Sequence, residues 1–421
     1  MKRVAIVAAV SAFAAASTGL SSSGAQGGAT QPYQQDACTF LSTPAATPDE
    51  TAWRLFVAAN CAGKKGGFAW EDWIEQEDLY PSVVGPSGVS PAKRTAVHRV
   101  HASQFGVMAD IARLRSAGKN AAAVLKAASQ GCRQINDFKG ALPPNVVDGG
   151  EICEETRINP VASAFITGQG YQWRTGQAAA AASGLQRIEF PPASIELKVM
   201  WLPAASLKSS FKCDGSNPEL HTEELTDESG KKTCYAMAGM HLIAKLYQKW
   251  LWATFEVKDM RTNPLRCVWF GPCRDSWGAV PAESYGGSGD NTQLTAQLAD
   301  LMNSAGLPQA FRNFRLVGTQ VDYGTSEEPT LNGNSVIEGE GVGMDQNESS
   351  CITCHSFSTV SAMGDEDTSD LDHPGPVGPY VPHHPDWLNR GFVWSLFLAC
   401  PDPPGTKPED RRCHWYIHDS K

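Results

Sequence analysis

The sequence predicts an α+β fold with a helical N-terminal part, a central antiparallel sheet and a C-terminal segment docked onto that body. Apolar residues recur at helical spacing near the N-terminus, three runs with strand-like alternation lie in the middle of the chain, and loop-forming residues surround a short cysteine motif near the end. We divide the chain, as parts of one integrated body, into a targeting segment (1–25), a flexible lead-in (26–46), a mostly helical part (47–185), a sheet-containing part (186–335) and the motif with the C-terminal segment (336–421).

The first 25 residues have the three regions of a secretory signal peptide. Lys2 and Arg3 precede an Ala-rich apolar run from Val4 to about Ala16, and a Ser/Gly-rich segment follows. We expect cleavage after Ala25 and export to the periplasm or beyond; the alternative is a short N-terminal helix that stays on the chain. The apolar run is too short to span a bilayer, and no later stretch approaches about 18 apolar residues, so no membrane span is expected.

The helical part should begin with a capped helix. Thr47-Pro48-Asp49 is typical of a helix start, and the spacing of the apolar residues that follow predicts a helix from Asp49 to Cys61. A second tryptophan-rich segment runs from Phe68 to Leu79, and residues 92–130 also have helical periodicity. These patterns are the basis for the mostly helical N-terminal part.

The middle of the chain predicts a sheet. Alternation and β-branched or aromatic residues predict strands at Ser194–Trp201, Tyr235–Leu246 and Lys249–Val257. A short helix is expected from Gln293 to Asn303, ended near Gly306. These three strands suggest an antiparallel sheet at the centre of the molecule.

The charge of the chain limits its partners. The formal net charge is −10, and residues 1–25 contain Lys2, Arg3 and no acid, so cleavage would leave −12. An acidic protein is poorly suited to binding nucleic acid or anionic lipid. We therefore expect basic proteins or neutral surfaces as partners, and no nucleic acid.

Cysteine usage predicts disulfides in an oxidising compartment. Of 12 cysteines, two belong to the motif described next, and the remaining ten fall into five local couples. Sequence alone cannot fix the connectivity, and local pairing is the simplest assignment. It gives Cys38–Cys61, Cys132–Cys153, Cys213–Cys234, Cys267–Cys273 and Cys400–Cys413.

The C-terminal part contains the pattern C-x-x-C-H at Cys351, Cys354 and His355, which is typical of covalent haem c attachment. Two thiols at this spacing can form thioethers to the two haem vinyl groups, and the adjoining histidine can bind the iron as its proximal ligand. The alternatives are a redox disulfide, half of a zinc site or a structural bridge. The adjoining His355 and the lack of a second C-x-x-C favour haem.

The motif does not indicate a stand-alone small cytochrome c fold. In that fold a methionine ligand and a C-terminal helix follow the motif helix by some tens of residues. Here 66 residues follow His355, they are rich in proline, and their sole methionine is Met363. We therefore expect the haem segment to be docked onto the larger α+β body.

Four segments together resemble a known group of proteins. They are Ala52-Trp53-Arg54-Leu55-Phe56, His241-Leu242-Ile243-Ala244-Lys245, Trp250-Leu251-Trp252-Ala253-Thr254-Phe255-Glu256 and Ser350-Cys351-Ile352-Thr353-Cys354-His355. In this combination the chain is similar to the bacterial exported monohaem "cytochrome c family" proteins of roughly this size. The resemblance implies one haem and export, and it implies no substrate.

The sixth iron ligand decides the function most directly, because a second strong ligand makes an electron carrier and an open position permits O₂ or peroxide chemistry. His241 is our first candidate, since Met237, Gly239 and His241 should share one strand face and Gly239 would leave room for a flat ring. Met363 and Met344 rank next. The other residues considered are Met237, Met240, His98 and His101, and each of the candidates could instead be an ordinary core residue.

Three function classes follow from these observations. An electron-transfer cytochrome working with a redox partner protein is favoured, because there is a single motif. A haem peroxidase or oxygenase with an open distal site is the alternative, favoured by the large size of the chain. A structural or binding protein in which haem staples the C-terminal segment is the third. No Ser-His-Asp, Walker or dinucleotide motif stands out, and we assign no catalytic residues.

Overall fold

The structure of the chain is a computed structural model. It describes residues 37–80, 133–134, 151–207, 211–226, 232–257, 275–280, 293–324, 332–334, 350–365 and 384–399.

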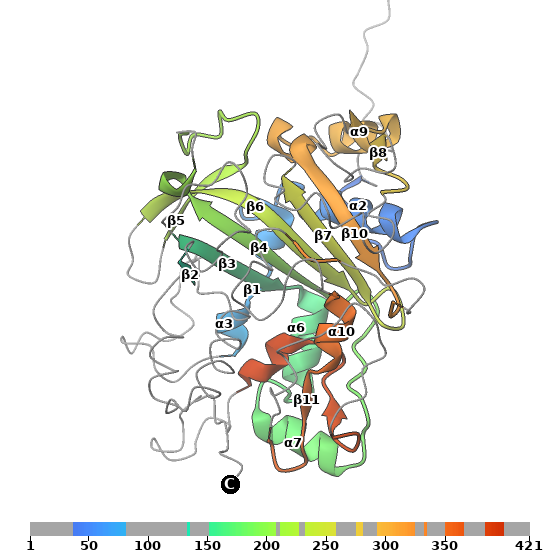
Figure 1. The fold of residues 1–421 in the computed structure, drawn as a ribbon. Coiled ribbons are helices and arrows are strands. Elements are labelled where there is room, and N and C mark those ends of the chain that lie inside the picture. Colours follow the sequence, from blue (N-terminus) through green and yellow to red (C-terminus); the bar gives the residue numbers. More distant parts are fainter. Residues whose placement is uncertain are drawn as a thin grey trace, which may run out of the picture.

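A twisted antiparallel sheet forms the centre of the molecule (Figure 1). Its six strands run in the order β1-β3-β4-β6-β7-β10, and two further strands, β2 and β5, pair with β3 and β6. The bounds are β1 Ile74–Glu75, β2 Arg133–Gln134, β3 Glu151–Ile158, β4 Ile195–Pro203, β5 Thr222–Thr226, β6 Lys232–Ala244, β7 Leu251–Val257 and β10 Phe314–Gln320.

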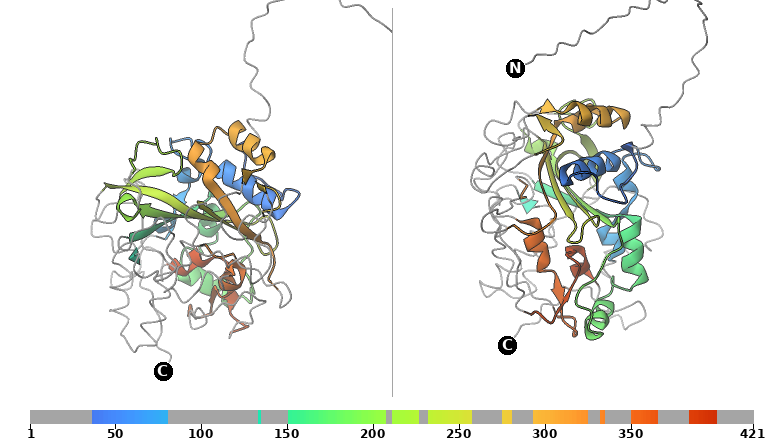
Figure 2. Two further views of the ribbon diagram at one scale, coloured as in Figure 1. Left: turned by 45° about the horizontal axis from the view of Figure 1, so that its top comes forward. Right: turned by 90° about the vertical axis from the view of Figure 1, so that its right-hand side faces the viewer.

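Few helices surround the sheet. Figure 2 shows α2 and α9 on the side of the sheet away from α10, while α6 and α7 lie below with the C-terminal segment. The α-helices in the described part of the chain are α2 Pro48–Ala59, α3 Gln76–Leu79, α6 Pro160–Gly168, α7 Arg174–Ala182, α9 Ala296–Ser304 and α10 Cys351–Ser356. The remaining elements are the 3₁₀ turns η1 Ala69–Asp72, η4 Ala204–Ser206, η6 Gln309–Asn313 and η8 Trp394–Leu398, and the pairs β8 Ala279–Val280 with β9 Gln293–Leu294 and β11 Thr359–Val360 with β12 Leu388–Asn389.

Several predicted elements are confirmed. The N-terminal helix is α2, and Thr47 caps it by accepting a hydrogen bond from the Glu50 amide at 3.1 Å. The three predicted strands are β4, β6 and β7, and the predicted helix before Gly306 is α9. The chain thus has a mixed α+β fold with a central six-stranded antiparallel sheet and few helices.

The division into a helical part and a sheet part is wrong at β3. This strand lies within the segment predicted to be mostly helical, yet it pairs with β4 in the middle of the sheet. Its sequence contains Glu154 and Glu155, and glutamate is depleted in strands, so no strand pattern stands out here. The edge strand β10 was not predicted either, and residues 92–130 lie outside the described residues.

The register of the strands defines two faces. Leu197, Val199 and their partners Leu242 and Met240 point to one face, which packs against α2, α9 and η6 in the first core. Lys198 and its partner His241 point to the other, which we call the motif face. The second core lies at the end of this face and includes Ile158, Ile166, Phe190, Ile243, Trp252, Ile352 and Leu396.

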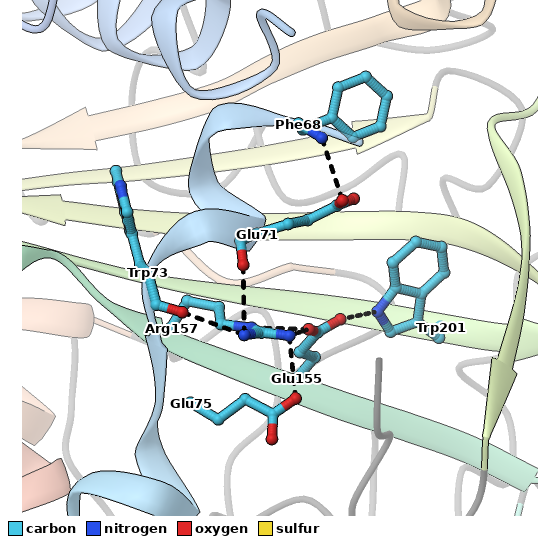
Figure 3. A network of polar contacts seen from close by, with 7 residues as sticks. All are labelled: Phe68, Glu71, Trp73, Glu75, Glu155, Arg157 and Trp201. Atoms are coloured by element: carbon cyan, nitrogen blue, oxygen red, sulfur yellow. Dashed lines mark hydrogen bonds and ion pairs between the residues drawn. The ribbon is translucent and has the colours of Figure 1, made fainter. Parts of the chain in front are cut away.

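A buried ionic network joins η1 and β1 to the sheet (Figure 3). Arg157 on β3 donates to Glu155 at 2.8 Å, to Glu75 at 2.9 Å and to the Trp73 carbonyl at 3.0 Å. The Trp201 indole donates to the other oxygen of Glu155 at 3.2 Å. Burial alone would lower the pKa of Arg157, but the two carboxylates outweigh it and raise that pKa. The network keeps a charge in a site where an unpaired one would be costly.

Replacing Arg157 by Ala should lower the free energy of unfolding by about 3–5 kcal/mol, because two buried carboxylates would lose their counter-charge. Lys232→Ala is the control, since its ion pair with Glu224 is largely exposed and should contribute at most about 1 kcal/mol. Urea unfolding followed by tryptophan fluorescence measures both. An equal loss for the two variants would show that the network contributes little to stability.

The disulfides agree with local pairing wherever both cysteines are described. Cys38–Cys61 and Cys213–Cys234 are formed, with Cα–Cα distances of 5.7 and 5.5 Å. The first one ties the predicted flexible lead-in to the segment that directly follows α2. Cys153 is also disulfide-bonded. The other cysteines of the predicted pairs lie outside the described residues: Cys132, Cys267, Cys273, Cys400 and Cys413.

The disulfides fit an oxidising, extracytoplasmic compartment. No helix in the described part of the chain is long and apolar enough to cross a bilayer.

Candidate functional site

The predicted motif forms the short helix α10, which β10 anchors to the motif face. Gln320, the last residue of β10, donates to the Ser350 hydroxyl at 3.1 Å and accepts from the Ile352 amide at 3.3 Å. Ile352 is fully buried in the second core. The helix is thus held at its first turn by a buried amide side chain and by apolar packing, which fixes the motif against the sheet.

Both motif cysteines are thiols. Cys354 is buried and Cys351 is half-buried. The Cys351 sulfur lies 3.5 Å from the Asn332 carbonyl oxygen. All other cysteines in the described ranges are disulfide-bonded, so the motif pair is chemically distinct from them. No group of three or more metal-ligating side chains occurs among the described residues.

A backbone carbonyl fixes the tautomer of His355. Its Nδ1 lies 2.8 Å from the Phe392 carbonyl oxygen, which can only accept, so Nδ1 carries the proton and Nε2 the lone pair. Burial, together with the charges of Lys198 and His241, lowers its pKa to about 3, although the hydrogen bond to Phe392 acts in the opposite direction. The imidazole is therefore neutral at neutral pH. Its ring also packs on Trp252, with the centroids 4.4 Å apart.

Residues 389–399 pack against α10. The Trp394 indole donates to the Cys354 carbonyl at 3.2 Å, and the Asn389 amide donates to the Ser356 carbonyl at 3.1 Å. Arg390, which is fully buried, donates to Gln177 on α7 at 2.7 Å and to the Thr359 carbonyl at 2.9 Å. These bonds position the carbonyl that orients His355.

His241 lies on the motif face in a row of polar residues across the sheet. The register aligns Lys198 on β4, His241 on β6 and Thr254 on β7. The Thr254 hydroxyl lies 2.8 Å from His241 Nδ1 and 2.9 Å from the Asn332 carbonyl oxygen. The structure therefore brings the first-ranked distal candidate to the same side of the sheet as the motif, where Asn332 contacts both Thr254 and Cys351.

The predicted arrangement around His241 needs two corrections. Met237 does not share its face, because Ala238 forms a bulge opposite β4, and Met237 pairs with Trp201 and packs with Met240 in the first core. The space over Gly239 is not open either. An added Cβ there would lie 2.8 Å from the Asn334 amide nitrogen.

Of the remaining distal candidates, the structure describes Met363. Met363 lies in a turn after β11, and its side chain is 86% exposed. Met344, His98 and His101 lie outside the described residues.

Sequence reasoning missed several residues of this site. Lys198 and Thr254 flank His241 only through strand register, and Phe392 acts through a backbone carbonyl. Asn332 comes from a loop with no motif of its own. A correct alignment of the three predicted strands would have identified Lys198 and Thr254, whereas no sequence pattern indicates the other two.

A half-buried carboxyl, Glu196, lies next to this site on the motif face. Its oxygen accepts a hydrogen bond from the Ser395 hydroxyl at 2.7 Å, and Tyr80 donates to the same hydroxyl at 3.5 Å. Burial raises the pKa of Glu196 to about 7, although Ser395 and Lys198 act in the opposite direction. This carboxyl therefore changes charge near neutral pH.

The raised pKa predicts a pH-dependent stability. In the unfolded chain Glu196 loses its proton near 4.5, but in the native protein only near 7. Between these values the unfolded chain binds fewer protons, so the free energy of unfolding should fall as the pH rises. Glu196→Gln should remove a decrease on the order of 1–3 kcal/mol between about pH 5 and about pH 8.

Urea unfolding of both proteins at the two pH values measures this difference. Glu189→Gln is the control, because its carboxylate is exposed and the variant should keep the wild-type dependence. Parallel profiles for the wild type and Glu196→Gln would contradict the raised pKa.

The chain has no match among protein-family models, curated proteins or solved structures. The resemblance to the exported monohaem proteins therefore depends on the four quoted segments alone.

Proposed function

We propose that the protein is an exported monohaem c-type cytochrome that transfers electrons through one covalently bound haem c. The observation that carries the proposal is the motif helix itself. Two thiols lie one turn apart beside a histidine whose Nδ1–H is committed to a backbone carbonyl, which leaves Nε2 available for iron. When bound, the haem supplies one-electron chemistry.

The residues of the chain have separate roles in this proposal. Cys351 and Cys354 hold the haem through thioethers, and His355 is the proximal ligand. Phe392 orients the imidazole through its carbonyl, and Trp252 packs against the ring and limits access of water. These are tasks of binding, orientation and exclusion of solvent, which suit an electron carrier.

His241 is the proposed distal ligand. It lies on the motif face, and its charge affects the pKa of His355, so the two imidazoles are electrostatically coupled. Two histidine ligands leave no open position for substrate, and they give a lower potential than a histidine and a methionine, because thioether sulfur stabilises ferrous iron better. The acidic chain would favour a redox partner protein with a basic docking surface.

The purified exported protein should retain its haem after denaturation and acid–acetone extraction, because thioether bonds survive this treatment. Its intact mass should exceed that of the processed chain by one haem. The variant with Cys351→Ala and Cys354→Ala is the control and should release its pigment or contain none. Complete extraction of pigment from the wild type would exclude covalent attachment.

The ferric wild type should be low-spin and six-coordinate, and His241→Ala should become high-spin and bind cyanide or azide readily, because the iron loses its sixth ligand. Optical and EPR spectra measure both changes. His221→Gln is the control, since its ring packs on Phe311 in the first core, and it should leave the spectrum unchanged. A high-spin wild type, or an unchanged spectrum in His241→Ala, would contradict the ligand assignment.

A haem enzyme with an open distal site is the second candidate. The observation that favours it is the side-chain oxygen of Asn332. Asn332 is fully buried, and its Nδ2 donates to the Trp252 carbonyl at 3.2 Å, which identifies the other side-chain atom as Oδ1. This oxygen is buried and accepts no hydrogen bond from the described residues. It could accept one from a small ligand with an N–H or O–H group. A high-spin wild type that turns over peroxide would support this function.

A further inference from the structure

The Thr254 hydroxyl has two neighbours and one proton. It is fully buried on β7, 2.9 Å from the Asn332 carbonyl oxygen and 2.8 Å from His241 Nδ1. A carbonyl oxygen can only accept, so the hydroxyl proton is committed to Asn332. Toward His241 the hydroxyl oxygen must then act as the acceptor.

The direction of these bonds determines the tautomer of His241. If Thr254 accepts, Nδ1 carries the imidazole proton and Nε2 carries the lone pair. The lone pair is what an iron ligand needs. His355 reaches the same state by a different route, since its Nδ1 proton goes to the Phe392 carbonyl.

The Asn332 carbonyl also links this arrangement to haem attachment. The Cys351 thiol lies 3.5 Å from this oxygen, which the Thr254 hydroxyl also contacts. A thioether has no S–H, so attachment at Cys351 removes this competing donor. The Thr254 hydroxyl would then be the remaining one of these two donors to the Asn332 carbonyl. This would strengthen the Thr254–Asn332 hydrogen bond, which makes Thr254 an acceptor toward His241.

We propose that Thr254 is a positioning residue that, through the Asn332 carbonyl, holds His241 in the Nδ1–H tautomer with Nε2 ready to bind the iron. This inference rests on the proposed function, because it gives a reason why His241 rather than another side chain becomes the sixth ligand. Thr254 itself contacts neither iron nor haem in this role.

Thr254→Val tests the role, because valine keeps the shape of threonine and removes the oxygen. His241 Nδ1–H would lose its acceptor and the ligand should weaken. We expect a partly high-spin ferric spectrum and a cyanide affinity higher by on the order of tenfold to a hundredfold. Thr254→Ser keeps the hydroxyl and should restore the wild-type spectrum and affinity, which a purely structural role of the methyl group would not explain.

A second measurement does not need haem. In the full chain produced without haem and labelled with ¹⁵N-histidine, long-range ¹H–¹⁵N correlation at a pH where the imidazole is neutral reports which nitrogen of His241 is protonated. The wild type and Thr254→Ser should show Nδ1–H, and Thr254→Val should shift toward Nε2–H.

The outcomes separate the two proposals. A wild type without covalent haem, or with high-spin iron, would overturn the proposed function, while the tautomer of His241 still tests the role of Thr254 by itself. A low-spin wild type whose Thr254→Val variant keeps both the spectrum and the Nδ1–H tautomer would overturn the inference. A shift of the spectrum and the tautomer together, reversed in Thr254→Ser, would support it.

Discussion

The register of β4, β6 and β7 is the constraint on which the candidate site depends. Side chains alternate between the two faces of a strand, so a shift of one residue would move Lys198, His241 and Thr254 from the motif face into the first core. The bulge at Ala238 has this effect locally. After the bulge along β6, His241 lies on the motif face. Before the bulge, Met237 lies on the apolar face that forms the first core. The one extra residue in the bulge thus places the side chains of His241 and Met237 on opposite faces of the sheet.

Backbone carbonyl groups, which can only accept hydrogen bonds, orient the imidazoles of both His355 and His241. The Phe392 carbonyl takes the Nδ1 proton of His355 directly, and the Asn332 carbonyl acts on His241 through the Thr254 hydroxyl. Backbone carbonyls are suited to this task because they cannot reverse the direction of a bond. The two loops that supply them are held in turn by buried contacts to the sheet and to α10.

Ionisable groups on the two faces of the sheet differ in whether an opposite charge lies close to them. On the first-core side, Arg157 stays charged because the carboxylates of Glu155 and Glu75 compensate for its burial. On the motif face, Glu196 has a hydroxyl and a more distant lysine instead of a close cation, and its pKa rises to about 7. The first arrangement stabilises the fold across the physiological pH range, whereas the second places a titrating group near the candidate haem site.

The sequence by itself determined the mixed fold class, the capped helix α2 and three strands of the sheet, because helix caps and strand alternation are local properties. It left the disulfide connectivity open, and the two described disulfides follow the simplest, local assignment. It also identified Cys351, Cys354 and His355 as the chemical motif. Only the tertiary structure revealed β3, whose charged residues are compensated by partners far away in the sequence, and β10. It alone decided that Thr254, Asn332 and Phe392 belong to the site, since strand register and backbone carbonyls position them and neither has a sequence pattern.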